Sequence, residues 1–186
     1  MPKGTLEVIA GCMSCGKSEE LIRRVRREEI AKKTIIVFKP VVDNRTDGCT
    51  VASRDGKSCD CVSLVDPAEA LERALGTHVV CFDEAQFFPT ELAAVADELV
   101  DRGSRVIVAG LDTDFRGQPF ETMALLMAKA DKVTKLTAVC MRCGEPATRS
   151  QRLINGAPAP YDAPRIQVGG DELYEARCRD CHSVPR

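Results

Sequence analysis

The sequence predicts an α/β fold in which a parallel sheet is flanked by helices and followed by a small cysteine-rich lobe. Three observations lead to this fold class. Segments typical of strands and helices alternate over residues 5–139, a glycine-containing loop motif lies between the first strand and the first helix, and two C-x-x-C pairs follow residue 139. Alternating strands and helices with right-handed crossovers build an open parallel sheet.

The elements follow from local composition. Five segments rich in apolar and β-branched residues are predicted to be strands, at residues 5–10, 35–38, 78–82, 105–109 and 132–139. Four segments are predicted to be helices, at residues 18–33, 67–75, 89–102 and 121–130. Asp66 is expected to cap the second helix with Pro67 in its first turn, and Gly103 is expected to end the third. The uninterrupted apolar runs 78–82 and 105–109 are typical of strands buried on both faces of a sheet.

Two stretches interrupt this alternation and indicate the domain organisation. Residues 39–63 are polar and turn-rich, so we expect a loop that is flexible or ordered by a ligand. From Cys140 onward the helical pattern ends, and proline and glycine are concentrated in residues 155–170. We therefore expect a main α/β domain at residues 1–139 and a separate small lobe at residues 140–186.

Composition limits the function. The chain of 186 residues is 44% apolar, enough for a real core, and its net charge of −2 argues against a broad basic surface for nucleic acid. The dense basic run 23–27 continues into two glutamates and is interpreted as a solvated helix face with partners one turn away. No signal peptide or apolar stretch of about 20 residues is visible, so we expect a cytoplasmic location without a membrane partner. There, the ten cysteines are expected to be metal ligands or free thiols rather than disulfides.

A complete G-x-x-x-x-G-K-[ST] motif occupies residues 11–18: Gly11, Cys12, Met13, Ser14, Cys15, Gly16, Lys17 and Ser18. In such a loop the backbone N–H groups enclose a polyphosphate, and glycine is needed where the chain approaches closely or takes positive φ. Lys17 is expected to neutralise the β- and γ-phosphates and Ser18 to contact Mg²⁺. An ordinary glycine-containing turn is the alternative, but it leaves the flanking strand and helix unexplained. The motif therefore predicts a P-loop (RecA-like) sheet that binds a nucleoside triphosphate at a helix N-terminus.

The apolar strand 78–82 ends in a second candidate segment, Asp83-Glu84-Ala85-Gln86, which we assign to the nucleotide-phosphate site. A carboxylate at the end of such a strand can reach Mg²⁺ directly or through water, and Asp83 has that position. Glu84 follows at the edge where ligands bind in open α/β sheets and can accept a proton from a substrate hydroxyl or water. The alternative is two capping acids before the next helix.

Two C-x-x-C pairs predict a structural zinc site formed by Cys140, Cys143, Cys178 and Cys181. Residues 144–177 separate the pairs, more than the about 15–20 residues of a short zinc ribbon, so this segment must loop out and return. Reduced free thiols are the alternative. His182 directly follows a ligand and is expected not to bind the metal, and Cys59-Asp60-Cys61 has no partner pair.

A loop at residues 110–120 follows the predicted strand 105–109 and carries two aromatic residues, a basic residue and two glycines. It could line an apolar pocket for a flat ligand. Without the other motifs, an ordinary connecting loop would be the simpler interpretation.

Taken together, these residues resemble the cellular-type (type II) thymidine kinases. The resemblance extends over essentially the whole chain through five segments in the family's order: 6–18, 83–88, 110–120, the spaced cysteine pairs, and Val168-Gly169-Gly170 followed by Tyr174. It implies ATP-dependent transfer of the γ-phosphoryl group to the 5′-hydroxyl of thymidine or deoxyuridine, with Mg²⁺, in a homotetramer. It also implies a zinc-held lobe whose long lasso loop closes over the nucleoside.

The resemblance also assigns residues. Glu84 would be the general base and Asp83 the carboxylate on the Mg²⁺ side. The nucleoside pocket would be formed by Met13, Phe87, Leu111, Phe115, Phe120 and Tyr174, and the backbone at Val168 and Gly169 would bond the pyrimidine edge. Asp43 and Arg45 match a family motif near the phosphates and sugar.

Two positions depart from the family's pattern. Cys12 stands where the family usually has proline or serine, and Cys15 where it usually has serine. Because the loop acts through backbone amides, neither is expected to abolish binding. Cys15 is expected to be sensitive to oxidation, since a nearby cation and a helix N-terminus lower a thiol pKa.

The sequence leaves two other functions open. A nucleic-acid-dependent ATPase or helicase is compatible with Asp83-Glu84-Ala85-Gln86 and a zinc ribbon, but such helicases need a second ATPase-like domain, and the acidic balance opposes nucleic-acid binding. A non-catalytic nucleotide-binding regulator would leave Glu84 without a purpose. We expect no stable nucleic-acid partner.

Overall fold

A six-stranded parallel sheet forms the centre of the computed structural model, which describes residues 2–41, 50–52, 56, 58–167 and 173–186. The strand order is β5-β2-β6-β7-β1-β8, and every neighbouring pair is parallel. The strands are β1 (Thr5–Gly11), β2 (Ile35–Pro40), β5 (Val62–Leu64), β6 (Val79–Phe82), β7 (Arg105–Leu111) and β8 (Lys132–Leu136). The predicted α/β fold class is confirmed.

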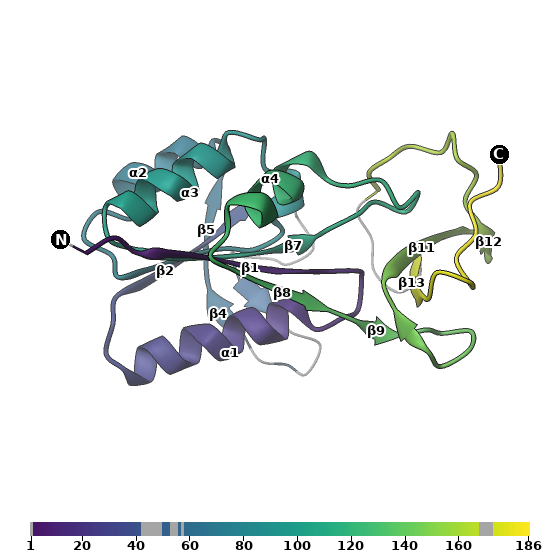
Figure 1. Cartoon of the computed structure of the whole chain (residues 1–186), viewed down its shortest axis with the longest axis horizontal. Coiled ribbons are helices and arrows are strands. Elements are labelled where there is room, and N and C mark those ends of the chain that lie inside the picture. The colour runs from purple at the N-terminus through teal and green to yellow at the C-terminus, as the bar shows by residue number, and fades with distance from the viewer. Residues whose placement is uncertain (1, 42–49, 53–55, 57, 168–172) are drawn as a thin grey trace.

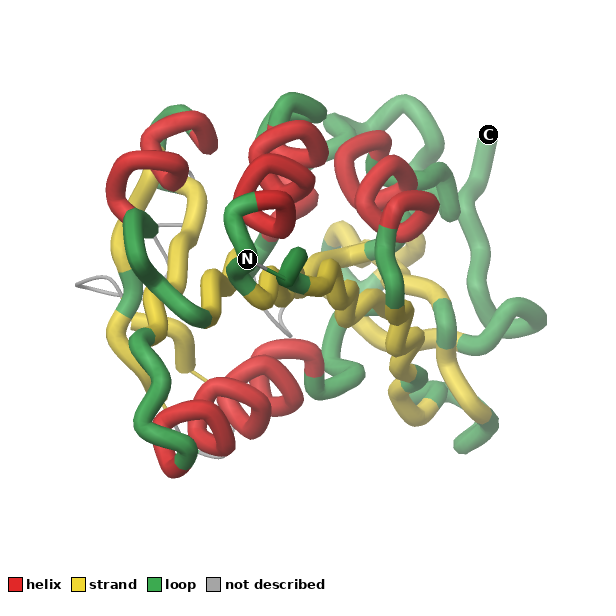
Figure 2. The backbone as a smooth tube through the Cα atoms, turned by 60° about the vertical axis from the view of Figure 1, so that its left-hand side comes forward, coloured by secondary structure: helices red, strands yellow, loops and turns green. Residues whose placement is uncertain are grey.

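Helices cover both faces of this sheet. Helix α1 (Lys17–Ile30) lies on one face, and α2 (Ala70–Arg73), α3 (Leu92–Asp101) and α4 (Glu121–Lys129) lie on the other (Figures 1 and 2). Two short 3₁₀ helices, η1 (Pro67–Glu69) and η2 (Ala85–Phe87), precede α2 and α3. Within the described ranges, each helix is too short or too polar to cross a membrane.

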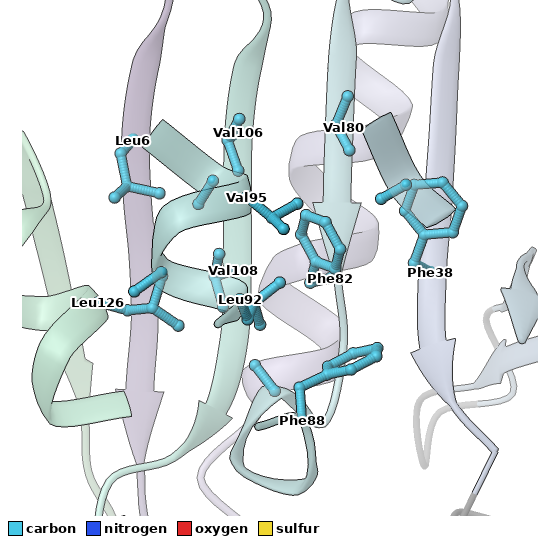
Figure 3. Close-up of a cluster of buried hydrophobic side chains, with 14 of the residues drawn as sticks. Leu6, Phe38, Val80, Phe82, Phe88, Leu92, Val95, Val106, Val108 and Leu126 are labelled. Atoms are coloured by element: carbon cyan, nitrogen blue, oxygen red, sulfur yellow. The ribbon is translucent and has the colours of Figure 1, made fainter. Parts of the chain in front are cut away.

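The strands are apolar on both sides because each side packs against helices. Along β6, Val80 and Phe82 belong to the cluster beneath α2–α4, whereas Val79 and Cys81 belong to the cluster beneath α1. The same alternation occurs in β1 and β7, as the period of two in a strand requires. Figure 3 shows the larger cluster, with Phe82 between Phe38 and the side chains of α3. This double burial explains the uninterrupted apolar runs in the sequence.

The register of the parallel strands brings their C-terminal ends together, and these ends form one edge of the sheet. Gly11 at the end of β1 is opposite Leu111 of β7 and Leu136 of β8. In Figure 1 this edge faces the C-terminal lobe. The loops that leave β1, β6 and β7 therefore meet between the sheet and the lobe.

The lobe is built from short antiparallel strands. Strand β9 (Ala138–Val139) pairs with β10 (Pro146–Ala147), and β11 (Arg149–Ile154) lies between β12 (Ala157–Pro158) and β13 (Tyr174–Arg177). The predicted strand 132–139 is thus divided: its first part extends the central sheet and its last two residues pair within the lobe. The sequence is strand-like throughout and does not mark where the chain changes partner.

The segment 39–63 differs from the expected loop. It contains β3 (Thr50–Ala52), which pairs with β4 (Ser58–Asp60), and β5, which adds an edge strand to the central sheet through β2. Edge strands this short have too few residues for a clear periodic pattern, so the polar context concealed them. Cys61 is disulfide-bonded, so the expectation of metal ligands or free thiols is wrong for this cysteine.

The basic run 23–27 is not entirely a solvated face. Arg24 is buried, and its guanidinium contacts Glu20 one turn away at 2.8 Å and Glu7 of β1 at 2.6 Å. Arg105 of β7 also pairs with Glu7 at 2.7 Å, so the charges of α1 continue into the sheet. A charge run on one element does not reveal carboxylates on another, and the sequence pattern therefore missed this network.

Candidate active site

The phosphate-binding motif forms the loop between β1 and α1. Gly16 takes a left-handed conformation (φ +84°) immediately before α1, where glycine is the favoured residue. A Cβ atom on Gly11 would lie 2.5 Å from the backbone oxygen of Leu136, so β8 approaches too closely for any other residue. Both glycines of the motif are thus explained by geometry, and the loop ends at the N-terminus of α1, where backbone N–H groups attract anions.

Lys17 points back into this loop. Its Nζ donates to the Cys12 carbonyl oxygen at 2.7 Å and lies 3.8 Å from Cys15 Sγ. The positive charge is therefore held beside the backbone that would enclose phosphates. Ser18 follows as the second residue of α1, half-buried, at the position expected for a Mg²⁺-contacting hydroxyl.

Asp83 is buried directly after β6. Burial raises the pKa of this carboxyl group to about 7, and the neighbouring negative charge of Glu84 adds to the effect. Lys39 and Lys17 oppose the shift. A bound cation beside Asp83 would stabilise the ionised form of this buried carboxyl group. Asp83 is therefore suited to be a cation ligand.

Glu84 stands at the beginning of η2 in a left-handed conformation (φ +51°), unusual for a residue with a side chain. Its carboxylate accepts a hydrogen bond from Gln86 Nε2 at 2.6 Å, and Gln86 Oε1 in turn accepts from the Leu111 backbone N–H at 2.9 Å. Gln86 is buried and so connects the loop after β6 to the end of β7. We infer that the strained backbone and this amide together orient the Glu84 carboxylate.

A cavity adjoins these groups at the edge of the sheet. It is lined by the sequence-predicted residues Met13, Phe87, Leu111, Phe115, Phe120 and Tyr174, together with Glu84 and Gln86. Met13 comes from the phosphate loop itself, and its backbone N–H bonds Ser150 Oγ of β11 at 3.0 Å. The structure therefore brings residues from six separate segments, between positions 13 and 174, to one site.

The cavity bounded by the described residues is small. Its volume is about 40 Å³, well below the roughly 300–1,000 Å³ of common ligand pockets. Residues 159–167, of which the last three line the cavity, are called the covering segment below. This segment or the lining side chains must move for a ligand of nucleoside size to enter. Four sequence-predicted residues, Asp43, Arg45, Val168 and Gly169, lie outside the described residues.

Sequence reasoning missed the residues that hold the covering segment in place. Asp114 is buried and accepts from the backbone N–H groups of Arg116 and Gln118 at 2.9 Å each. Its other oxygen accepts from Arg165 Nε at 2.9 Å, while Arg165 Nη2 donates to the Pro119 carbonyl at 2.7 Å. The Arg165 guanidinium also lies 4.9 Å from the centre of the Phe120 ring. Arg165 thus ties the chain just before residue 168 to the loop 110–120.

The other missed lining residues are Thr113, Asp114, Ser150, Ile166 and Gln167. Ile166 and Gln167 directly precede the Val168-Gly169-Gly170 segment that the sequence had marked. Ser150 could have been found only from the pairing of its strand. Its hydroxyl is useful because tertiary structure places it against the phosphate loop.

The four lobe cysteines form the cluster that the C-x-x-C pairs predict. The sulfurs of Cys140, Cys143, Cys178 and Cys181 all lie within 4.8 Å of one another, and Cys143 Sγ and Cys178 Sγ are 3.6 Å apart. Thiolates about 2.3 Å from a shared tetrahedral Zn²⁺ lie about 3.8 Å apart, so these positions suit a metal ion such as zinc.

His182 is not part of this cluster, in agreement with the sequence expectation. Its Nε2 lies 2.8 Å from the Phe115 carbonyl oxygen, and burial lowers the pKa of the imidazole. Because a carbonyl oxygen can only accept, the imidazole donates here, and His182 connects the second cysteine pair to the loop that lines the cavity.

Comparison with known proteins agrees with this geometry. Residues 4–182 match the family model described as thymidine kinase. A thymidine kinase of Coprothermobacter proteolyticus is 56% identical over 182 residues, which is 98% of this chain and 92% of that protein. Among solved structures, the flagellar accessory protein FlaH of Methanocaldococcus jannaschii superposes with a TM-score of 0.51 at 12% identity, over 78% of this chain and 76% of the other. The last similarity concerns the fold alone.

The role of Arg165 is testable without any ligand. Arg165→Ala should speed amide hydrogen exchange in residues 159–167 by roughly fivefold or more, because it removes the fork that binds Asp114 and Pro119. Arg165→Lys, which retains the charge but not the fork, should have a smaller effect. Arg73→Ala is the matched control, since Arg73 of α2 forms an exposed ion pair with Glu69 of η1. Unchanged exchange in Arg165→Ala would show that this contact does not hold the segment.

Proposed function

The chain belongs to the thymidine kinase family of phosphotransferases, and from this premise we propose that it transfers the γ-phosphoryl group of ATP to the 5′-hydroxyl of thymidine or deoxyuridine with Mg²⁺. One observation carries the proposal. Met13 of the phosphate loop and Glu84 line the same cavity. A hydroxyl bound there is within reach of both a carboxylate and the phosphates that the loop would hold.

On the nucleotide side, the backbone amides of residues 11–18 would bind the polyphosphate, with Lys17 neutralising the β- and γ-phosphates. Ser18 and Asp83 would hold Mg²⁺, which when bound supplies positive charge to the phosphoryl group being transferred. Lys17 already contacts the loop backbone at Cys12, so its charge needs little reorganisation. Such preorganised charge is the main source of catalysis in phosphoryl transfer.

On the acceptor side, Glu84 would take the proton of the 5′-hydroxyl as the oxygen attacks phosphorus. The hydrogen bond from Gln86 holds the carboxylate toward the cavity. Phe115, Phe120, Leu111 and Met13 would enclose the base and exclude water, with Phe87 near the sugar.

The base itself would be recognised by main-chain groups at Val168 and Gly169. Support comes from the covering segment, whose residues Arg165, Ile166 and Gln167 line the cavity just before them. Further along the chain, Tyr174 returns to the cavity, and its hydroxyl donates to the Gln167 carbonyl at 2.9 Å. We also assign Asp43 and Arg45 to the phosphate and sugar side on the family motif.

The proposal includes a nucleotide-binding domain at 1–139 and a lobe at 140–186 that carries a lasso loop and is held by a structural Zn²⁺ in the four-cysteine cluster. It also includes a homotetramer that works in the cytoplasm without a stable nucleic-acid or membrane partner. Exposed apolar side chains such as Ile30 on α1, 82% exposed, are compatible with contact between subunits.

The Glu84 carboxylate can be tested directly. Glu84→Gln should retain ATP binding but lower kcat by roughly 10²–10⁴-fold, the usual contribution of a general base. Glu91→Gln, which changes an exposed carboxylate nearby, should leave kcat unaltered. A kcat near the wild-type value in Glu84→Gln would exclude Glu84 as the base.

Substrate choice tests the function as a whole. Thymidine and deoxyuridine should be phosphorylated. Deoxycytidine should be rejected, because cytosine has an acceptor at N3 and a donor at C4 where thymine has a donor and an acceptor. Two mismatches, each leaving buried groups unpaired at about 1–3 kcal/mol, should lower kcat/KM by on the order of 10²–10⁴-fold. Deoxyguanosine should fail because a purine is larger than a pyrimidine and would overfill the base pocket that Met13 and Phe115 are proposed to bound. Comparable kcat/KM for thymidine and deoxycytidine would refute recognition by the main chain.

Metal content tests the cysteine cluster. Protein purified without chelator should contain about one Zn²⁺ per subunit, because four thiolates leave no open position. Cys178→Ser should lose the metal and lower the Tm, since metal binding is coupled to folding. His182→Ala is the control and should keep its zinc. Loss of zinc from His182→Ala, or its absence from the wild-type protein, would contradict the assignment.

A further inference from the structure

The phosphate loop contains a C-x-x-C pair of its own, separate in the sequence from the four cysteines of the lobe. Cys12 and Cys15 are separated by Met13 and Ser14, and both are free thiols. Cys12 is fully buried, whereas Cys15 is partly exposed. The two side chains pack in one cluster, and each thiol shifts the pKa of the other, raising that of Cys12 and lowering that of Cys15, so the two sulfurs lie close together.

The surroundings of Cys15 favour a reactive thiolate. Its pKa is lowered to about 6, mainly by the adjacent Cys12 thiol and also by the positive charge of Lys17, against the opposing effects of burial and Asp112. Lys17 Nζ lies 3.8 Å from the sulfur. Cys15 also lines a surface cavity together with Gly16, Glu19 and Leu136, through which a small oxidant can reach the sulfur. An accessible thiolate beside a second thiol is the arrangement of a redox-active pair.

We propose that Cys12 and Cys15 form a redox-modification site, in which a peroxide converts the two thiols into a disulfide and thereby closes the phosphate loop to nucleotide. The Cys15 thiolate attacks a peroxide oxygen, the O–O bond breaks, and Cys15 becomes a sulfenic acid. The sulfur of Cys12 then attacks Cys15, the S–O bond breaks, and water leaves with the Cys12 proton. In total two thiols are oxidised and one hydrogen peroxide is reduced to two waters.

The disulfide would change the loop in three ways. It joins the two neighbouring sulfurs at about 2.05 Å and so draws their backbones together. It removes the S–H group of Cys12, which donates to the Ala147 carbonyl of β10 at 3.4 Å. It also removes the thiolate charge next to Lys17. The amides between the two cysteines would then no longer be placed to enclose phosphates, a consequence that rests on the proposed function.

Other thiols would react as well, and the experiment must separate them. Thiolates of the metal cluster and Cys59 are also open to oxidation. Cleavage after Lys3 and Lys17 releases a peptide of residues 4–17 that contains Cys12 and Cys15 and no other cysteine. A disulfide within this peptide makes it lighter by two hydrogen atoms and prevents alkylation of both thiols.

The test treats the full chain with hydrogen peroxide, blocks free thiols with N-ethylmaleimide, and analyses peptide 4–17 by mass spectrometry, while ATP binding is measured by calorimetry. We expect an unalkylated, lighter peptide and ATP affinity weakened by about tenfold or more, both restored by dithiothreitol. Zinc release is followed in parallel. A peptide that stays doubly alkylated, or carries sulfinic or sulfonic acid in place of the disulfide, would overturn the proposal.

Variants separate this site from other oxidation. Each is compared before and after peroxide with its own reduced form. Cys15→Ser and Cys12→Ser should lose the reversible change in ATP binding, whereas Cys59→Ser should keep it. An equal reversible loss in Cys15→Ser would overturn the proposal. If the reduced wild-type protein binds no ATP, the proposed function fails, while the peptide result still decides whether the disulfide forms.

Discussion

Parallel hydrogen bonding between β1 and its two neighbours sets the position of every group at the candidate site. Because Gly11 is in register with Leu111 and Leu136, the loops after β1 and β7 leave the sheet at the same level. The loop after β6 joins them through Gln86, whose amide bonds both Glu84 and the Leu111 backbone. A shift in this register would separate the phosphate loop from the carboxylates and the cavity.

The C-terminal lobe depends on the same edge. Besides the contacts of Arg165, the hydrogen bonds that connect it to the α/β domain include those of Cys12 Sγ with the Ala147 carbonyl, the Met13 backbone with Ser150, and His182 with the Phe115 carbonyl. Each involves a loop that leaves the sheet, so the lobe is anchored directly on the site. The cysteine cluster holds the two ends of the intervening chain, and this is why a metal remote from the reacting atoms would still influence the site.

Closure over the cavity depends on charge as well as packing. Asp114 is buried within its own loop, where two backbone N–H groups and Arg165 satisfy it. Breaking the contact with Arg165 would leave the buried Asp114 carboxylate with less compensating positive charge. The contact therefore stabilises the position of the covering segment over the cavity. The same contact places Arg165 over Phe120, so the apolar wall and the covering segment are positioned together.

By itself, the sequence determined the α/β class, the phosphate loop, the strand-terminal carboxylates and the cysteine cluster, because each depends on local spacing or on burial on both faces of a strand. Only the tertiary structure decided that β5 pairs with β2 and β9 with β10. It also decided the burial of Arg24, the contacts of Ser150, Asp114 and Arg165, and the disulfide of Cys61. In these cases the partner lies on another element, and chain spacing does not specify which distant groups will meet. The proximity of Cys12 and Cys15 depends on both: their spacing is local, but the burial of Cys12 and the partial exposure of Cys15 come from packing between the sheet and the lobe.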